Sequence, residues 1–248
     1  MKIFVFSDNI KIFKPIYKIL SKYNLNIKYF CSIESKFMKD RFPFIKALNI
    51  NSMDLLDFDI GFSIHSKQIF PKKLVENVLC INLHPGYIPY NKGIYPHIFS
   101  IINKLPTGAT LHIMDENIDS GNVIEQVEIQ IEEKDTSLSL YNKILTKEVN
   151  IFKRNIRSIL NNSFSLKTPK KYNSYNSKAD FEKLCKINMN EITTMKSAIS
   201  FLSALSHPPY RNAYFLDEKG NKIFVTIRLE STITGGSSLK DKYGLYCA

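Results

Sequence analysis

The chain has 248 residues, of which 44% are hydrophobic and 23% are charged, with nine Gly, ten Pro and no Trp. This composition excludes fibrous, low-complexity and intrinsically disordered proteins and predicts a soluble globular protein with one sizeable core. The longest early apolar stretch, residues 3–6, is far shorter than a membrane span or the apolar region of a signal peptide, so we expect a cytoplasmic protein.

The charge of the chain is strongly positive, because 34 Lys and Arg stand against 23 Asp and Glu and give a formal net charge of +11. Such an excess favours polyanions, including nucleic acids, nucleotides and phosphorylated or polycarboxylate ligands. A solvated Lys- and Asn-rich surface that reflects biased coding explains many of the same lysines. The cysteines form no C-x-x-C pair, which predicts isolated thiols instead of a disulfide framework or a zinc site: Cys31, Cys80, Cys185 and Cys247.

The first third of the chain alternates predicted strands and helices. Residues 2–6 form an apolar run that ends in polar residues 7–9, which is typical of a buried parallel strand. An amphipathic helix follows, and we expect Pro15 in its first turn. Further predicted elements are strands at residues 27–31, 46–50, 59–65 and 78–83, a short helix after the first of these, and a helix at residues 72–77. This alternation predicts an α/β protein with a Rossmann-like, mostly parallel sheet and helices on both faces.

The order of elements then changes. We predict a helix at residues 94–103, extended segments at 110–114 and 122–131, and a long amphipathic helix at 137–160. Residues 161–178 are rich in Asn, Ser, Lys and Tyr and are the candidate linker. We expect a larger domain over residues 1–178 and a C-terminal region over 179–248. In that region the predicted elements are helices at 178–187 and 191–206 and a hairpin of 212–216 with 222–229, and the hairpin needs cover from the larger domain or another chain.

Several familiar sites are absent from the sequence. The glycines form no G-x-G-x-x-G, Walker A loop or G-x-S-x-G, so the usual dinucleotide, P-loop and hydrolase interpretations lose their basis. Residues 115–121 place acidic or amide oxygens where a calcium loop has them. However, Ser120 stands where that loop has glycine, Gln126 stands where it has glutamate, and the flanks are predicted strands. We therefore expect no metal site.

The most informative constellation is Asn82 and His84 at the end of a predicted parallel strand, just before Pro85-Gly86. Residues two apart in a strand project to the same face, and ligands of open α/β sheets bind at the carboxyl ends of the strands. An amide that stabilises an oxyanion beside an imidazole that takes a proton is a minimal set for acyl transfer. Asp119 is the best candidate to hold the imidazole, with Asp115 and Glu116 behind it. From residue types alone, a structural Asn-His pair explains the pattern equally well.

Four segments in order and spacing resemble formyltransferases that use N10-formyltetrahydrofolate. They are Asn82 to Gly86, the Pro-Tyr-Asn-Lys-Gly run at 89–93, the Gly-Ala-Thr-Leu-His run at 108–112, and residues 115–121. The resemblance covers residues 58–150 well and the first strand and helix loosely. It implies that Asn82, His84 and Asp119 are the catalytic residues, while His112 is structural. The implied donor is N10-formyltetrahydrofolate, and no metal is implied.

The choice of acceptor divides this family into branches. The Tyr-rich stretch 86–96, residues 136–141 and the tail 208–215 are similar to the branch that formylates amino groups of dTDP-linked dideoxysugars. This resemblance implies dTDP-4-amino-4,6-dideoxyglucose as the acceptor, a role in surface polysaccharide (O-antigen) synthesis, and a homodimer through the C-terminal hairpin. The alternatives are a dTDP-3-amino sugar or charged initiator tRNA, the substrate of methionyl-tRNA formyltransferases, which usually carry a larger C-terminal barrel.

The resemblance also implies two sets of binding residues. The pterin is expected against the loop after the fourth strand, and the sugar nucleotide against the first strand and the Tyr-rich stretch, where Lys92 meets phosphate charge. The candidates for the folate are Ser66, Lys67, Gln68, Ile69, Phe70 and Asp115. The candidates for the sugar nucleotide are Asp8, Asn9, Tyr87, Tyr90, Asn91, Lys92 and Tyr95. His65, His97 and His207 are interpreted as packing or surface residues.

In the implied mechanism the neutral amine attacks the formyl carbon, and Asn82 with a protonated His84 stabilises the oxyanion. The proton of the amine is removed through His84 or a nearby water, and Asp119 orients the imidazole and favours its charged form. A noncatalytic RNA-binding protein is the alternative from a different class. The charge of +11 and the 13 tyrosines favour it. No RNA-binding motif supports it, and it predicts a steep salt dependence of RNA affinity without formyl transfer.

Overall fold

The computed structural model describes residues 1–52, 54–172 and 174–231, so Cys247 and most of the last eighteen residues lie outside the described part. A seven-stranded sheet in the order β3-β2-β1-β4-β5-β7-β8 forms the centre of the molecule. Strands β3, β2, β1, β4 and β5 run parallel to their neighbours, whereas β7 and β8 are antiparallel. The predicted α/β fold with a mostly parallel sheet is confirmed.

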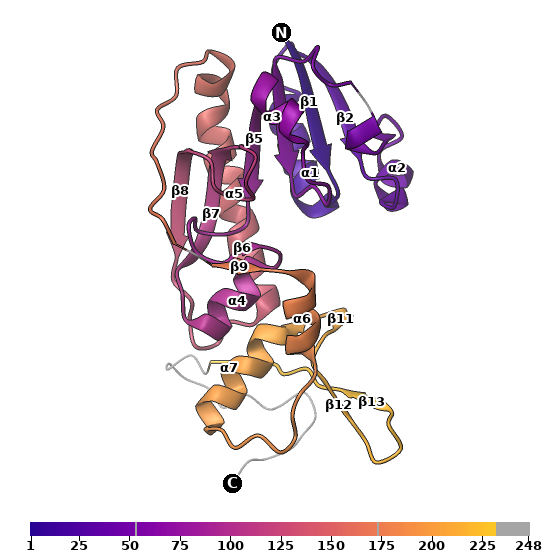
Figure 1. Ribbon diagram of the computed structural model, residues 1–248, viewed down its shortest axis with the longest axis vertical. Helices are drawn as coiled ribbons and strands as arrows, with labels where there is room; N and C mark the ends of the chain where they lie inside the picture. The colour runs from indigo at the N-terminus through magenta and orange to yellow at the C-terminus, as the bar shows by residue number, and fades with distance from the viewer. Residues whose placement is uncertain (53, 173, 232–248) are drawn as a thin grey trace, which may run out of the picture.

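The first third of the chain builds the parallel part of this sheet (Figure 1). Each predicted strand and helix occurs, although the third strand is only two residues long. Its elements are β1 (Lys2–Ser7), α1 (Ile10–Leu20), β2 (Asn26–Cys31), α2 (Lys36–Arg41), β3 (Lys46–Ala47), the 3-10 helix η1 (Ile50–Ser52), β4 (Ile60–Ile64), α3 (Lys72–Asn77) and β5 (Leu79–His84).

Helix α1 begins earlier than the sequence suggested, because Asn9 caps it. The Asn9 side chain accepts a hydrogen bond from the backbone N–H of Lys11 at 3.0 Å, which satisfies one of the free donors of the first turn. Pro15 therefore lies inside the helix and not in its first turn, where the prediction placed it. The buried residues Ile12, Phe13 and Ile16 surround that position and hold the helix on the sheet.

Both faces of the sheet are covered, as the alternation of β1 shows. Ile3 and Val5 belong to the larger apolar cluster, which α1 and α5 complete, whereas Phe4 and Phe6 belong to a second cluster on the opposite face. Residues of a strand alternate between faces, so one short strand contributes to two cores. The three described cysteines, Cys31, Cys80 and Cys185, are buried free thiols, as predicted.

The remaining elements extend the sheet and add a C-terminal region, which lies at the lower end of Figure 1. The elements are β6 (Lys92–Gly93), α4 (Pro96–Asn103), β7 (Thr107–Ile113), β8 (Val123–Ile129), α5 (Ser137–Leu160), β9 (Tyr175–Asn176), α6 (Lys178–Cys185), α7 (Met195–Leu205), β10 (Ser206–His207), β11 (Tyr210–Arg211), β12 (Tyr214–Leu216) and β13 (Lys222–Phe224). The strands β12 and β13 form the predicted hairpin, although each is shorter than expected.

The candidate linker, residues 161–178, pairs with two earlier segments of the chain. Its strand β9 pairs with β6 in parallel, Lys92 with Tyr175 and Gly93 with Asn176. Lys167 also forms an isolated bridge with Val123. The segment that leads to the C-terminal region therefore contacts the Tyr-rich stretch directly, which the sequence did not indicate.

Across the described ranges, no helix combines the length and the apolar character that crossing a bilayer requires. The same ranges hold no group of three His, Cys, Asp or Glu side chains arranged to bind a metal ion.

Candidate active site

The candidate site lies at the carboxyl end of β5, where the antiparallel strand β7 is its neighbour. Asn82 pairs in register with His112, and His84 pairs with Thr110. The chain leaves β7 and returns through residues 114–122, so Asp119 comes back to the end of β5. The end of β5 therefore meets β7 and the loop that follows β7, and ligands of open α/β sheets bind at the carboxyl ends of the strands.

The amide, the imidazole and the carboxylate lie within contact distance of one another. Asn82 Nδ2 is 3.3 Å from Asp119 Oδ1, and His84 Nδ1 is 3.4 Å from the same oxygen. His112 Nε2 lies 3.2 Å from Asn82 Nδ2 and 3.6 Å from Asp119 Oδ1. The predicted convergence of Asn82, His84 and Asp119 is present in the structure, and His112 stands beside it as a support for the Asn82 amide.

The Asp119 carboxylate is buried but surrounded by donors. Burial by itself raises the pKa of a carboxyl group, yet the imidazoles of His84 and His112 and the backbone N–H of Gly93 hold the pKa of Asp119 well below its usual range. The Gly93 N–H donates to Asp119 Oδ2 at 3.0 Å. Asp119 is therefore ionised at neutral pH and has a fixed orientation.

The His84 imidazole is neutral at physiological pH. Burial lowers its pKa to about 4, although the Asp119 carboxylate acts in the opposite direction. Because Nδ1 faces Asp119, that nitrogen carries the proton and Nε2 carries the lone pair. Nε2 is buried without a hydrogen-bond partner. This differs from the expected protonated His84, since the low dielectric of the site favours the neutral ring.

Gly86 makes room for this imidazole. A Cβ atom at Gly86 would lie 2.4 Å from His84 Nε2 and 3.1 Å from Pro96 Cβ. The first of these distances is shorter than real Cβ contacts in proteins. The Pro-Gly sequence after the strand therefore leaves the lone pair of Nε2 next to a bare backbone.

The residues proposed for the sugar nucleotide are distributed around this site. The Lys92 Nζ donates to Ser120 Oγ at 2.9 Å, next to Asp119, so its charge lies at the edge of the site. Tyr90 packs against Tyr172 with ring centroids 4.8 Å apart, and Tyr95 packs against Phe181 at 4.5 Å. Tyr87 is half-buried in the loop between β5 and β6.

Asn91 has a different role from the one expected. Its side chain is completely buried, with Nδ2 donating to Ser100 Oγ at 3.0 Å and Oδ1 accepting from Asn103 Nδ2 at 3.2 Å. Its backbone N–H donates to Ser174 Oγ at 2.9 Å. Asn91 therefore joins the loop between β5 and β6, residues 85–91, to α4 and to the linker. We call this segment the active-site loop. The side-chain amide of Asn91 has no free polar atom for a ligand.

The loop after β4 has some side chains on the surface and one, Phe70, in the core. Ile69 is 69% exposed, and Lys67 is exposed as well. Phe70 is 4% exposed and packs against Phe4 and Phe6, so it cannot cover a ligand as predicted, because its ring completes the second core cluster.

The polar residues of the same loop hold it in place. The Gln68 side chain accepts from the Ile50 N–H at 2.7 Å and donates to the Leu48 carbonyl at 2.9 Å. Ser66 accepts from the Gln68 N–H at 3.0 Å, and the exposed Asp115 accepts from the Asn117 N–H at 2.9 Å. Of the expected folate contacts, Ile69 and Lys67 present the freest side chains.

The two residues at the end of β1 are already engaged. The Asp8 carboxylate accepts from Ser32 N–H at 2.8 Å, from Ser32 Oγ at 2.7 Å and from Lys67 N–H at 2.8 Å. Asp8 thus ties the loops after β1, β2 and β4 together and is not free for a hexose, contrary to the expectation. Asn9, besides capping α1, donates to Tyr141 at 2.6 Å and lies 3.2 Å from His65 Nδ1.

Glu148 is a further buried polar residue near the site, and it was not among the residues predicted from the sequence. Glu148 is 0% exposed on α5 and pairs with His65 at 2.8 Å. A signal was present, because Glu148 continues the apolar spacing of Leu140 and Ile144 along the buried face of the helix. A carboxylate in such a position is expected to have a buried partner.

The fold and this site point to one class of protein, the acyl-transferring enzymes, because an amide, an imidazole and a carboxylate at the carboxyl end of a parallel strand are groups that acyl transfer can use. Residues 49–156 match the family model described as formyl transferase, and residues 180–231 match the one described as N-formyltransferase dimerization C-terminal domain.

Individual relatives agree with this class. A dTDP-4-amino-4,6-dideoxyglucose formyltransferase from Mycobacterium tuberculosis is 39% identical over 173 residues, which cover 70% of this chain and 74% of the relative. The crystal structure of a 4-N formyltransferase from Francisella tularensis superposes with a TM-score of 0.90 and 45% identity over 93% of this chain and 98% of that one. WlaRD, a sugar 3N-formyl transferase crystallised with dTDP and 5-N-formyl-THF, gives a TM-score of 0.72 and 26% identity. The superposition covers 88% of this chain and 83% of WlaRD.

The chain belongs to the formyltransferase family, and the resemblance seen in the sequence is confirmed. It is an enzyme, so the alternative of a noncatalytic RNA-binding protein is not retained.

Proposed function

We propose that this enzyme transfers a formyl group from N10-formyltetrahydrofolate to the amino group of a dTDP-linked amino-dideoxyhexose. The observation that carries the proposal is the meeting of Asn82, His84 and Asp119, with a partnerless lone pair on His84 Nε2. The acceptor we favour is dTDP-4-amino-4,6-dideoxyglucose, because the Mycobacterium relative bears that name and the Francisella structure is called a 4-N formyltransferase. The product would serve surface polysaccharide synthesis, and the cytoplasmic location stays a prediction.

The residues divide the chemical work as follows. The neutral His84 Nε2 accepts a proton from the acceptor nitrogen as that nitrogen bonds to the formyl carbon, and afterwards gives it to the nitrogen that leaves. Asp119 keeps the proton of His84 on Nδ1 and stabilises the imidazolium that forms. The contacts of Asn82 Nδ2 are long, 3.2 and 3.3 Å, so an N–H can turn to the stronger acceptor, the oxyanion.

The site suits a folate donor. The segment 66–69 lies at the carboxyl end of β4, which is next to β5 in the sheet, and the exposed Ile69 offers an apolar face to a flat ring. The orphaned Nε2 of His84 supplies the polar atom that a reacting group needs. Lys92 and the paired rings of Tyr90 and Tyr172 supply a cation and aromatic faces for the nucleotide.

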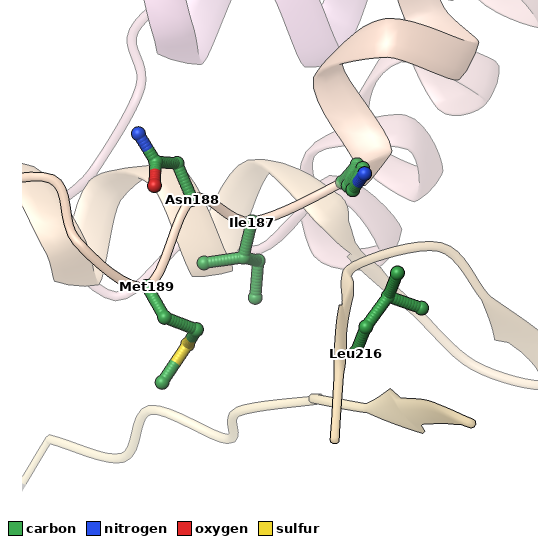
Figure 2. A pocket seen from close by; sticks show the side chains of 5 residues that line it. Ile187, Asn188, Met189 and Leu216 are labelled. Carbon is green, nitrogen blue, oxygen red and sulfur yellow. The ribbon is translucent and has the colours of Figure 1, made fainter. Parts of the chain in front are cut away.

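We also propose that the enzyme is a homodimer through its C-terminal region. Residues 180–231 match the model named for dimerization, and α7 and the hairpin expose large apolar side chains. These are Met195 at 76%, Ile199 at 41%, Leu216 at 42%, Ile223 at 41% and Phe224 at 41%. Figure 2 shows Ile187, Met189 and Leu216 around a cavity of about 390 Å³ between the loop after α6 and the hairpin. Apolar surface of this kind is typical of a subunit contact.

A dTDP-3-amino sugar is the second candidate acceptor, because WlaRD, a sugar 3N-formyl transferase, shares the fold. The experiment offers N10-formyltetrahydrofolate with dTDP-4-amino-4,6-dideoxyglucose, with a dTDP-3-amino sugar, or with charged initiator tRNA, and identifies the formylated product by mass spectrometry. We expect the 4-amino sugar to be consumed at least tenfold faster than the others. Faster consumption of the 3-amino sugar or of tRNA would overturn the choice of acceptor, and formylation of none would overturn the proposal.

A further inference from the structure

A chain of hydrogen bonds leads from the buried Glu148 to the edge of the active site. Both carboxylate oxygens of Glu148 lie within 2.8 and 2.9 Å of His65 Nε2. On the other side of the ring, the Tyr141 hydroxyl is 3.2 Å from His65 Nδ1. Asn9 Nδ2 donates to that hydroxyl oxygen at 2.6 Å. Four side chains from the ends of β1 and β4 and from α5 thus form one continuous polar network.

The hydrogen bonds of this network can be ordered from donor to acceptor, from Tyr141 through His65 to Glu148. An ionised Glu148 carboxylate can only accept, so His65 Nε2 is the donor of this pair, and in that tautomer of the ring Nδ1 carries the lone pair. Two donors lie 3.2 Å from Nδ1, the Asn9 amide and the Tyr141 hydroxyl. Because the Asn9 amide makes its shorter contact, 2.6 Å, with the hydroxyl oxygen, the hydroxyl proton is free to point to Nδ1. A proton that reaches the Tyr141 oxygen can therefore be passed to His65 as the hydroxyl proton moves to Nδ1.

The network lies next to the catalytic imidazole. The parallel neighbouring strands β4 and β5 pair Ile64 with Leu83, so His65, the first residue after β4, follows beside His84, the last residue of β5. Such strands are about 4.8 Å apart. Besides burial, the His65 imidazole acts to lower the pKa of His84. Asn9 and Tyr141 are half-buried, whereas the His65 side chain is only 9% exposed and Glu148 is fully buried. The outer end of the network is therefore the end that a substrate can approach.

The buried carboxylate is costly for the fold. Moving a carboxylate out of water carries a large free-energy penalty, which a partner offsets only in part. Burial raises the pKa of Glu148, although the His65 imidazole acts in the opposite direction. A purely structural contact between α5 and the sheet could be made by apolar side chains, as Ile144 and Ile151 do on the same helix face. The network is thus a candidate for a chemical role.

The proposed reaction creates a need for such a group. Amines of this kind titrate near the range of a protein α-amino group, about 8, and so arrive mainly as ammonium at neutral pH. Attack on the formyl carbon needs the neutral amine. The proton lost at bond formation passes through His84 to the departing nitrogen, so the earlier proton of the ammonium requires another acceptor and finally leaves to solvent.

We propose that His65, held by Glu148 and reached through the Tyr141 hydroxyl, accepts the proton that the acceptor ammonium loses before it attacks the formyl carbon. The inference rests on the proposed function. In this step an N–H bond of the ammonium breaks and its electron pair stays on the amine nitrogen. An O–H bond forms on Tyr141 as the hydroxyl proton moves to His65 Nδ1, and the Glu148 carboxylate stabilises the resulting imidazolium. Glu148 acts as a positioning residue.

The surroundings of His65 favour this assignment. The ionisable groups that face it are Glu148 and Tyr141 from α5, His84 from β5 and His97 from α4, while the Asp8 carboxylate turns to Ser32 and Lys67. Burial lowers the pKa of His97 to about 3, so it stays neutral. Burial also raises the pKa of Tyr141, so its hydroxyl passes a proton on and does not itself become a stored anion. Glu148 is the sole carboxylate among the groups just named that contacts His65.

The test measures kcat/KM for formylation against pH from 6 to 9.5 in the wild type, Tyr141→Phe and Glu148→Gln. We expect the wild type to change little between pH 7 and 9. Both variants should be about tenfold slower at pH 7 than at pH 9, because about one amine in ten is neutral at pH 7. Glu125→Gln is the matched control, since Glu125 contacts Arg154 and Asn155 of α5 away from the network. Its profile should follow the wild type.

Tyr141→Phe keeps the Glu148–His65 pair, so it remains informative if Glu148→Gln fails to fold. A uniform loss of activity at all pH values in Tyr141→Phe would mean a structural role, and an unchanged profile would mean no role; either result overturns the inference. Failure of the proposed function is recognised separately, because the wild type would then formylate no amino sugar at any pH.

Discussion

At the scale of single residues, the proposed chemistry depends on a neutral imidazole whose Nε2 has no hydrogen-bond partner in the protein. His84 achieves this because burial lowers its pKa to about 4, while Asp119 fixes which nitrogen carries the proton. The sequence indicated the three residue types and their meeting point. It did not indicate the charge state, because burial of an imidazole depends on the antiparallel neighbour strand β7 and on the loop that covers it.

The ionisation of His84 is directly measurable. In an NMR titration of the ring Cε1–H signals, we expect His84 to remain neutral down to about pH 4. In Asp119→Asn its pKa should fall further, because the carboxylate raises it. A midpoint near 6.5, the ordinary value of histidine, would refute the neutral imidazole.

Gly86 is the residue that gives this imidazole its space. Gly86→Ala should lower kcat at least tenfold, because the new methyl group meets His84 Nε2 at 2.4 Å. Steady-state kinetics with a melting curve of each variant check this. Gly220→Ala is the control: its backbone φ is +80° and its Cβ would meet nothing within 4 Å, so the substitution strains a turn without touching the site. Equal activity of Gly86→Ala and the wild type would show that the imidazole does not lie there.

At the scale of elements, the active-site loop depends on a short pairing that no propensity reveals. The strands β6 and β9 have two residues each, too few for a recognisable alternation, and they pair across more than 80 positions of sequence. The longer elements were predictable for the opposite reason: α3 and α5 have the expected bounds, and β1, β2, β4 and β5 match within one residue or two. The sequence pattern is sufficient to predict an element when apolar residues recur along it at the spacing of one buried face.

Asn91 tests the importance of that pairing. Asn91→Ala removes a buried amide and leaves partners unsatisfied, which should lower the free energy of unfolding by about 1–3 kcal/mol in a urea titration. Asn103→Ala removes a partner of the same amide at an exposed position and should cost less than half as much. Equal costs would mean that Asn91 is not the anchor of the loop.

At the scale of the whole molecule, the C-terminal region extends beyond the sheet and exposes its own apolar surface (Figure 1). The sequence predicted its helices and hairpin, but it could not show how the linker docks, because that depends on Ser174 and Asn176 meeting the buried Asn91. A path of direct contacts therefore connects the proposed dimer region to Gly93 and to the Asp119 carboxylate.

The subunit contact has its own test. Ile199→Asp and Phe224→Asp place a charge in the exposed apolar surface of α7 and the hairpin, so we expect sedimentation velocity to show a monomer where the wild type is a dimer. Ile33→Asp alters an isoleucine that is more exposed than Ile199, 55% against 41%, in the loop between β2 and α2, and should remain dimeric. A dimer in all three variants would place the contact elsewhere.

The most direct measurement is the rate of formyl transfer from N10-formyltetrahydrofolate to dTDP-4-amino-4,6-dideoxyglucose in the wild type, Asn82→Ala and His84→Ala, with folding checked by circular dichroism. Loss of a group that stabilises the transition state costs about 100- to 1000-fold, and each variant should slow by that factor while it keeps its fold. Turnover within threefold of the wild type in a folded variant would contradict the account.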